Sequence, residues 1–133
     1  MKKDIRTILC VDDDADDREL LGDIMNKVAP EVIVVFAEDG LQAMDLLQKG
    51  HELKNLPCLI VLDLNMPFLD GRQTFERIKA NPNYDNIPLV ILSTSDSPAD
   101  KDSFKKGGIP FFVKPVEMSV LKNIAQQMVN ICA

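Results

Sequence analysis

The sequence predicts an α/β fold in which helices cover both faces of a five-stranded parallel sheet. Five short apolar runs rich in β-branched residues alternate with five longer segments of helical period, which is the order of elements in such folds. The short runs are apolar throughout, as expected of strands that are buried on both sides. With 133 residues, 46% of them hydrophobic, the chain is long enough to form one domain around one core.

Each predicted strand is short, apolar and bounded by residues typical of turns. In chain order the strands are Ile5 to Val11, Val32 to Phe36, Cys58 to Leu62, Leu89 to Leu92 and Ile109 to Val113. Parallel neighbours require crossover connections, which we expect to be right-handed. Because the sequence contains no linker, repeat or low-complexity tract, we expect residues 1–133 to form a single domain with no output domain.

The helices are expected between and after these strands, over residues 15–28, 39–49, 72–80, 97–106 and 117–131. Turn signals separate the elements: in order they are Ala29-Pro30, Asp39-Gly40, Gly50, Asp70-Gly71, Asn81-Pro82-Asn83 and Gly107-Gly108. Three aspartates stand at the start of the first helix, namely Asp14, Asp16 and Asp17. We interpret them as caps and partners of the helix dipole.

Charge and composition exclude several classes of function. The net charge is −6, from 15 basic and 21 acidic residues, which argues against nucleic-acid binding because that requires a basic face. The sequence has no stretch of 18 apolar residues and no signal-type run, so we expect a soluble, cytoplasmic protein without a membrane span. The cysteines lack Cys-x-x-Cys spacing, and we expect Cys10 and Cys58 to be free thiols that pack as small hydrophobes.

Polar residues follow four of the five predicted strands. Asp12 and Asp13 come after the first strand, Asp63 after the third, Ser93 after the fourth and Lys114 after the fifth. In the flavodoxin-like, doubly wound strand order 2-1-3-4-5, the first, third and fourth strands are neighbours. Ligands bind beyond the carboxyl ends of the strands in such sheets, so we expect these side chains to form one site.

The chemistry of this set favours phosphoryl transfer. Carboxylates held close together repel one another unless a cation neutralises them, and a compact set of oxygen ligands suits Mg²⁺. A carboxylate nucleophile, a metal ion and a lysine are the groups that phosphoryl transfer requires. Asp63 interrupts an apolar run, where an unpaired buried acid costs several kcal/mol by transfer estimates. The sequence therefore predicts a functional acid at this strand end.

Four motifs together resemble the receiver domain of bacterial response regulators. They are Ile8 to Asp14, Leu62 to Pro67 with Asp70-Gly71, Pro88 to Ser93, and Phe112 to Pro115. The resemblance runs from about Arg6 to Ile131. One such motif would be weak, but four in order at matching spacing are specific. The resembled family includes the chemotaxis regulator and the stand-alone receivers linked to phytochrome-type kinases.

The resemblance implies a role for each matching acid at the site. Asp63 resembles the phosphoacceptor and one ligand of the Mg²⁺ ion. Asp13 resembles the direct ligand of that ion, Asp12 an acid that assists through a water molecule, and Asn65 the residue that contributes its backbone carbonyl. The chain would then be a signalling switch and no enzyme beyond its own phosphorylation and dephosphorylation.

Other positions resemble the residues that sense the phosphoryl group. Ser93 stands where a hydroxyl moves to a phosphoryl oxygen, although threonine is commoner there, and Lys114 where a lysine pairs with the phosphoryl group. The resemblance implies a cis peptide bond before Pro115. Phe111 matches an aromatic switch that is more often tyrosine, and plain filling of the core is an equally open interpretation of it.

Two alternatives from other classes stay open. A degenerate receiver would act as a constitutive interaction module without taking up phosphate. A haloacid-dehalogenase-type phosphatase also uses a strand-end aspartate, but it usually has a second acid two residues later, where this chain has Asn65. An EF-hand calcium loop fails, because Asp17 and Asp23 stand where it requires glycine and glutamate.

The expected partners are a histidine kinase or a histidine phosphotransferase, as the resemblance implies. The apolar residues of the segment 116–132 cover an arc of roughly 220° at about 100° per residue, whereas packing on one core requires a stripe of only about 100° or somewhat more. The resembled family pairs or docks targets through the fourth helix, fifth strand and fifth helix. We therefore expect a homodimer or a target-binding face there, unless the whole arc is core.

Overall fold

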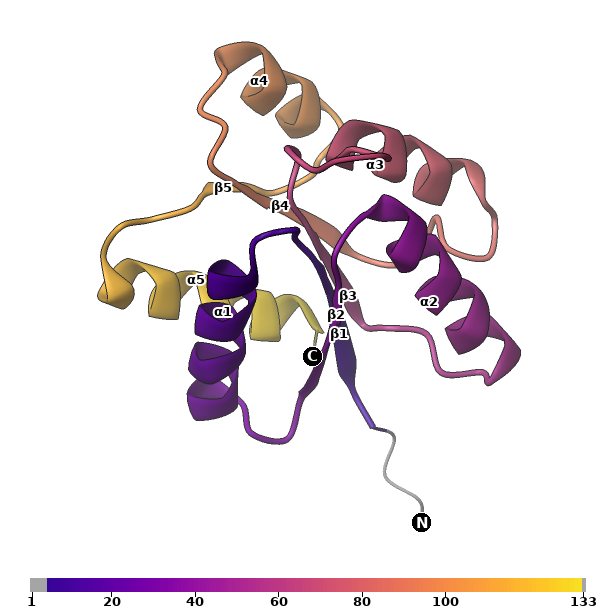
Figure 1. The fold of residues 1–133 in the computed structure, drawn as a ribbon, viewed down its shortest axis with the longest axis horizontal. Helices are drawn as coiled ribbons and strands as arrows, with labels where there is room; N and C mark the ends of the chain where they lie inside the picture. Colours follow the sequence, from indigo (N-terminus) through magenta and orange to yellow (C-terminus); the bar gives the residue numbers. More distant parts are fainter. Residues whose placement is uncertain (1–4, 133) are drawn as a thin grey trace.

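A computed structural model describes residues 5–132; residues 1–4 and 133 of the expected domain lie outside that range. It contains one five-stranded parallel sheet in the order β2-β1-β3-β4-β5, which confirms the predicted fold class and strand order (Figure 1). The strands are β1 (Thr7–Val11), β2 (Ile33–Ala37), β3 (Leu59–Leu62), β4 (Leu89–Ser93) and β5 (Phe111–Val113).

The helices form two layers, one on each face of the sheet (Figure 1). Their bounds are α1 (Ala15–Val28), α2 (Gly40–Glu52), α3 (Gly71–Ala80), α4 (Pro98–Lys106) and α5 (Met118–Cys132). Alternate residues of β1 point to opposite layers: Ile8 and Cys10 pack with α1 and α5, whereas Leu9 and Val11 pack with α2, α3 and α4. The strands are apolar at successive positions because both faces of the sheet are covered.

Polar side chains begin four of the helices. Asp14, Asp39, Asp70 and Ser97 each accept a hydrogen bond from the backbone N–H three residues later, which satisfies a donor left free by helix geometry. Asp14 therefore caps α1 as expected, and at α3 Gln73 completes a capping box with Asp70.

Two strands start two residues later than predicted. β5 begins at Phe111 rather than Ile109, since the N–H of Ile109 donates to the carbonyl of Phe104 at the end of α4. β1 begins at Thr7 rather than Ile5. No helix in the described part of the chain has both the length and the hydropathy needed to cross a membrane.

The expectation of a free thiol at Cys58 is wrong. Cys58 and Cys132 form a disulfide between the start of β3 and the end of α5, with their Cα atoms 5.0 Å apart although 74 positions separate them in sequence. That Cα separation lies within the usual range for disulfides. Cys10 is free and buried, and burial raises the pKa of its thiol well above the usual range, so it packs as a neutral hydrophobe.

Reduction should lower the stability of the protein. A cross-link that closes a loop of this length stabilises a fold by about 4 kcal/mol in the chain-entropy model, because it restricts the unfolded chain. We expect a reductant, or the double substitution Cys58→Ser/Cys132→Ser, to lower the midpoint of thermal unfolding.

The double variant also serves as the control for the reductant, because added reductant should not lower its midpoint of thermal unfolding any further. Alkylation of the unfolded but unreduced wild type should label Cys10 alone. Labelling of all three cysteines there would contradict the pairing.

Candidate functional site

The hydrogen-bond ladder of the sheet places the site at the carboxyl ends of the strands. The N–H of Asp63 donates to the carbonyl of Val11 over 3.0 Å, and the N–H of Lys114 donates to the carbonyl of Ser93 over 2.8 Å. Each side chain thus leaves the sheet one residue beyond the last regular pair. Four successive strands in the sheet order β1-β3-β4-β5 contribute to one edge.

Three carboxyl groups meet at this edge. One carboxylate oxygen from each of Asp12, Asp13 and Asp63 lies within 4.8 Å of the other two. Asp12 and Asp63 are only 5% and 4% exposed, whereas Asp13 is open to solvent. Burial raises the pKa of Asp12, although the hydrogen bond to Lys114 partly offsets this. Two buried acids and one exposed acid form a half-open set of hard oxygen ligands, which fits a divalent cation that retains some of its water.

Lys114 compensates the buried negative charge. Its ammonium lies 2.7 Å from Asp12 Oδ2, 2.8 Å from Asp17 Oδ2 and 3.3 Å from Asp63 Oδ2. Burial alone would lower the pKa of Lys114, but the hydrogen bonds to Asp12 and Asp17 and the charges of Asp12 and Asp63 outweigh it and hold that pKa above the usual range. The lysine therefore stays charged in the site.

Asp17 is the site residue that sequence reasoning missed. We interpreted it as a partner of the helix dipole, and it does lie in the first turn of α1. Its carboxylate nevertheless contacts Lys114, which is 97 positions away in sequence. The available signal was its place in the acidic run that follows β1, a few residues after Asp12 and Asp13.

The prediction of a cis peptide bond before Pro115 is wrong. None of the peptide bonds in residues 5–132 is cis. The long side chain of Lys114 already reaches three carboxylates from a trans backbone. The trans isomer of such a bond is favoured by about 0.5–1 kcal/mol, and nothing in this geometry opposes that preference.

Ser93 and Phe111 lie on the α4 side of the site. Ser93 is fully buried at the end of β4, and its Oγ accepts a 3.2 Å hydrogen bond from the N–H of Ser95. The ring of Phe111 is half-buried and lies 6.0 Å from the ring of Phe104 on α4. Phe104 in turn meets Phe75 of α3 edge to face at 5.1 Å. Both interpretations of Phe111, core filling and switching, are compatible with this position.

An ion pair joins α3 and α4 next to the loop that carries Ser95. Arg72 Nε donates to Asp100 over 3.0 Å, and Ser95 Oγ donates to the same carboxylate over 3.1 Å. The guanidinium of Arg72 holds the pKa of Asp100 below its usual range. The loop that follows Ser93 is therefore tied to two helices, a connection that sequence spacing did not reveal.

The segment after Asp63 folds back closely on the strand end. Its Asn65 N–H points to Asp63 Oδ1 at 3.4 Å, and the N–H of Gly71 donates to the carbonyl of Leu64 over 3.0 Å. A Cβ atom at Gly71 would lie 2.1 Å from the backbone oxygen of Asp63, so only glycine lets α3 start here. Phe68, in the same loop, has a φ of +63° and is 83% exposed.

Gly71→Ala should destabilise the protein by about 1–3 kcal/mol, the usual range for overpacking a tight site. The added methyl group would push the start of α3 away from the backbone of Asp63 and Leu64. Chemical denaturation measures the loss. Gly107→Ala is the matched control, because a Cβ there meets nothing closer than 3.5 Å; equal losses in the two variants would contradict the packing argument.

Comparison with known proteins gives consistent similarities. The family model described as the response regulator receiver domain matches residues 8–126. The response regulator Rcp1 of Synechocystis sp. is 38% identical over 97 residues, which cover 71% of this chain and 66% of that protein.

Solved structures agree with these sequence matches. The phosphorylated cyanobacterial phytochrome response regulator RcpA superposes with a TM-score of 0.81 at 30% identity, covering 92% of this chain and 89% of that one. The Mn²⁺-bound form of Rcp1 superposes with a TM-score of 0.79 at 31% identity, covering 92% of this chain and 90% of that one.

Proposed function

The chain belongs to the response regulator receiver domain family, and from this premise we propose that Asp63 accepts a phosphoryl group in a Mg²⁺-dependent switch. Receiver domains of this family are signalling components of two-component systems. One observation carries the assignment: the buried carboxylate of Asp63 lies 3.3 Å from the ammonium of Lys114 and within 4.8 Å of a carboxylate oxygen from each of the two other acids of the cluster. A histidine kinase or histidine phosphotransferase would supply the phosphoryl group.

Asp63 would act as the nucleophile. A carboxylate oxygen attacks phosphorus, the bond from phosphorus to the donor nitrogen breaks, and the electron pair of that bond leaves with the imidazole. Mg²⁺, when bound, neutralises charge on the phosphoryl oxygens. We propose that Asp13, Asp63 and the backbone carbonyl of Asn65 hold the ion directly, with Asp12 assisting through water.

Lys114 and Ser93 would stabilise the phosphorylated state. The ammonium of Lys114 is already 3.3 Å from Asp63 and would pair with a phosphoryl oxygen. The hydroxyl of Ser93 accepts from Ser95 in this structure, so rotating it toward the phosphoryl group would break that bond and disturb the loop before α4. Phe111 would respond by repacking against Phe104, because it has no phenolic hydroxyl.

The output surface would be the face formed by α4, β5 and α5. Part of the broad apolar arc of α5 is core: Leu121, Ile124, Ala125, Met128 and Cys132 are buried. Four other apolar residues in or just before the helix remain at least 36% exposed, and they are Val116, Met118, Val120 and Ile131. Met118 lines a groove between α5 and α1, and the other exposed residues support a protein contact of the α5 segment, with a target or with a second copy of the chain.

Acetyl phosphate with Mg²⁺ should add one phosphoryl group to the protein, because the nucleophile, the metal ligands and the lysine already converge. Intact mass measures the uptake, and Asp63→Asn should abolish it. Unchanged labelling in that variant would contradict the choice of acceptor. A folded protein that takes up no phosphate would instead be a constitutive interaction module.

Mg²⁺ should stabilise the fold by relieving repulsion in the cluster. If the site binds with a dissociation constant of about 1 mM, about 10 mM metal should add about 1.4 kcal/mol to the free energy of unfolding. Asp13→Asn should stabilise the metal-free protein and remove the response to metal. Thermal melting at low ionic strength tests both, and a wild-type midpoint insensitive to Mg²⁺ would count against a shared site.

A further inference from the structure

Asp17 contacts the same ammonium as the proposed acceptor. Asp17 Oδ2 accepts a hydrogen bond from Lys114 Nζ over 2.8 Å, whereas Asp63 Oδ2 lies 3.3 Å from that nitrogen. The backbone of Asp17 is fixed, because its N–H donates to the Asp14 carboxylate that caps α1. The carboxylate is thus held toward Lys114 by the first turn of the helix.

From these contacts we infer that Asp17 is a positioning residue that holds Lys114 before phosphorylation and competes with the phosphoryl group for it. The inference rests on the proposed function, because it needs a phosphoryl group on Asp63. In the unphosphorylated site, a carboxylate from α1 already occupies the lysine that the phosphoryl group would bind, whereas the other acids of the site come from strand ends.

The number of hydrogen-bond donors on the ammonium of Lys114 explains why Asp17 and the phosphoryl group compete for it. A lysine ammonium has three N–H donors, and three carboxylates surround this one: Asp12, Asp17 and Asp63. The phosphoryl group forms on Asp63 and takes the place of that carboxylate, so its oxygens compete for Lys114 with the two acceptors that remain, Asp12 and Asp17.

Exposure decides which acceptor gives way. The side chain of Asp17 is 38% exposed, whereas those of Asp12 and Asp63 are 7% and 6% exposed. Returning the Asp17 carboxylate to water requires the least rearrangement, since it is already partly hydrated. Asp17 is thus the partner that Lys114 releases when the phosphoryl group arrives.

Replacing Asp17 should strengthen the binding of a phosphoryl mimic and weaken the binding of Mg²⁺ alone. In Asp17→Asn, Lys114 is free to pair with a phosphoryl mimic, so beryllofluoride should bind about fivefold more tightly at saturating Mg²⁺, the scale of a partly exposed ion pair. Without the mimic, Lys114 should settle more firmly on Asp12 and Asp63. Mg²⁺ alone should then bind more weakly.

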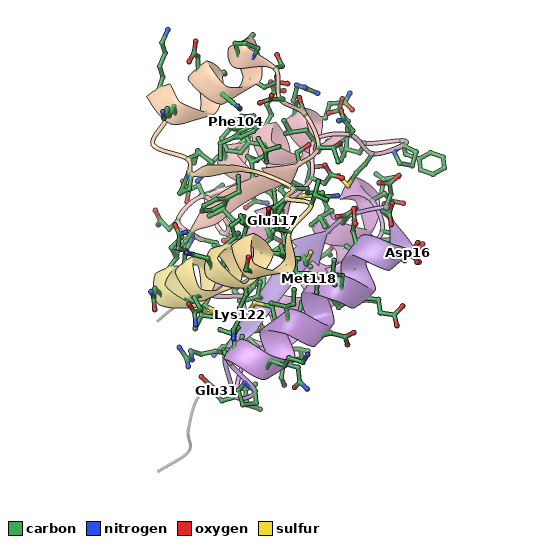
Figure 2. All side chains as sticks on the ribbon, turned by 90° about the vertical axis from the view of Figure 1, so that its left-hand side faces the viewer. Asp16, Glu31, Phe104, Glu117, Met118 and Lys122 are labelled. Carbon is green, nitrogen blue, oxygen red and sulfur yellow. A yellow bond between two sulfur atoms is a disulfide. The ribbon has the colours of Figure 1, made fainter. Side chains whose placement is uncertain are left out.

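Asp16→Asn is the matched control. Asp16 is the adjacent residue in the first turn, is exposed, and points away from the body of the protein at the start of α1 (Figure 2). It is absent from the ion pairs of Lys114 in the described residues. Its replacement removes the same charge from the same turn without removing a contact to the lysine.

The experiment is calorimetric titration of the full chain with beryllofluoride at saturating Mg²⁺, and with Mg²⁺ alone. The proteins are wild type, Asp16→Asn, Asp17→Asn, Lys114→Ala and the double variant Asp17→Asn/Lys114→Ala, each checked by thermal melting. We expect Asp17→Asn to tighten beryllofluoride binding well beyond the effect of Asp16→Asn. That excess should vanish in the Lys114→Ala background, since the two residues act through one contact.

Two results would overturn the inference in distinguishable ways. If wild type binds beryllofluoride but Asp17→Asn behaves like Asp16→Asn, or binds the mimic more weakly, Asp17 is no competitor and the proposed function stands. If the folded wild type binds no beryllofluoride even at saturating Mg²⁺, the proposed function fails and this inference fails with it.

Discussion

The compensation of buried carboxylates by one lysine is the interaction on which the site depends. Asp12 and Asp63 are almost completely buried next to each other, and Asp13 lies within the same cluster. Like charges at such distances in a partly dry environment raise the free energy of the fold unless a cation offsets them. Lys114, the residue after β5, supplies that cation and contacts both buried acids.

The sheet makes this arrangement possible because it fixes where each charged side chain leaves the backbone. Both faces of the strands are filled by apolar packing against two helix layers, which leaves the carboxyl edge as the place for polar groups. Close backbone approach at Gly71 and the capping of α1 by Asp14 then hold the loops around the acids. The geometry of the site thus depends on backbone packing and helix capping around it as well as on the charged groups themselves.

Contacts continue from this edge toward α4. The loop after Ser93 is tied through Ser95 to Asp100, and Asp100 pairs with Arg72 of α3. On the apolar side, the ring of Phe111 lies against Phe104 of the same helix. A displacement of Ser93 would therefore act on α4 through both polar and aromatic contacts. These contacts are the observations behind the proposal that the signal passes through α4.

The sequence by itself determined the strands and the residues at their carboxyl ends, because hydrophobic period and turn residues are local signals. The strand order was predicted from the fold class that this pattern of elements indicates. Helix starts were predictable to within a residue, since capping side chains act within a single turn. The tertiary structure alone decided the Cys58–Cys132 pairing, the contact of Asp17 with Lys114 and the trans bond before Pro115. The first two join residues far apart in the chain. Such contacts depend on how the elements pack, and local sequence carries no record of those distances.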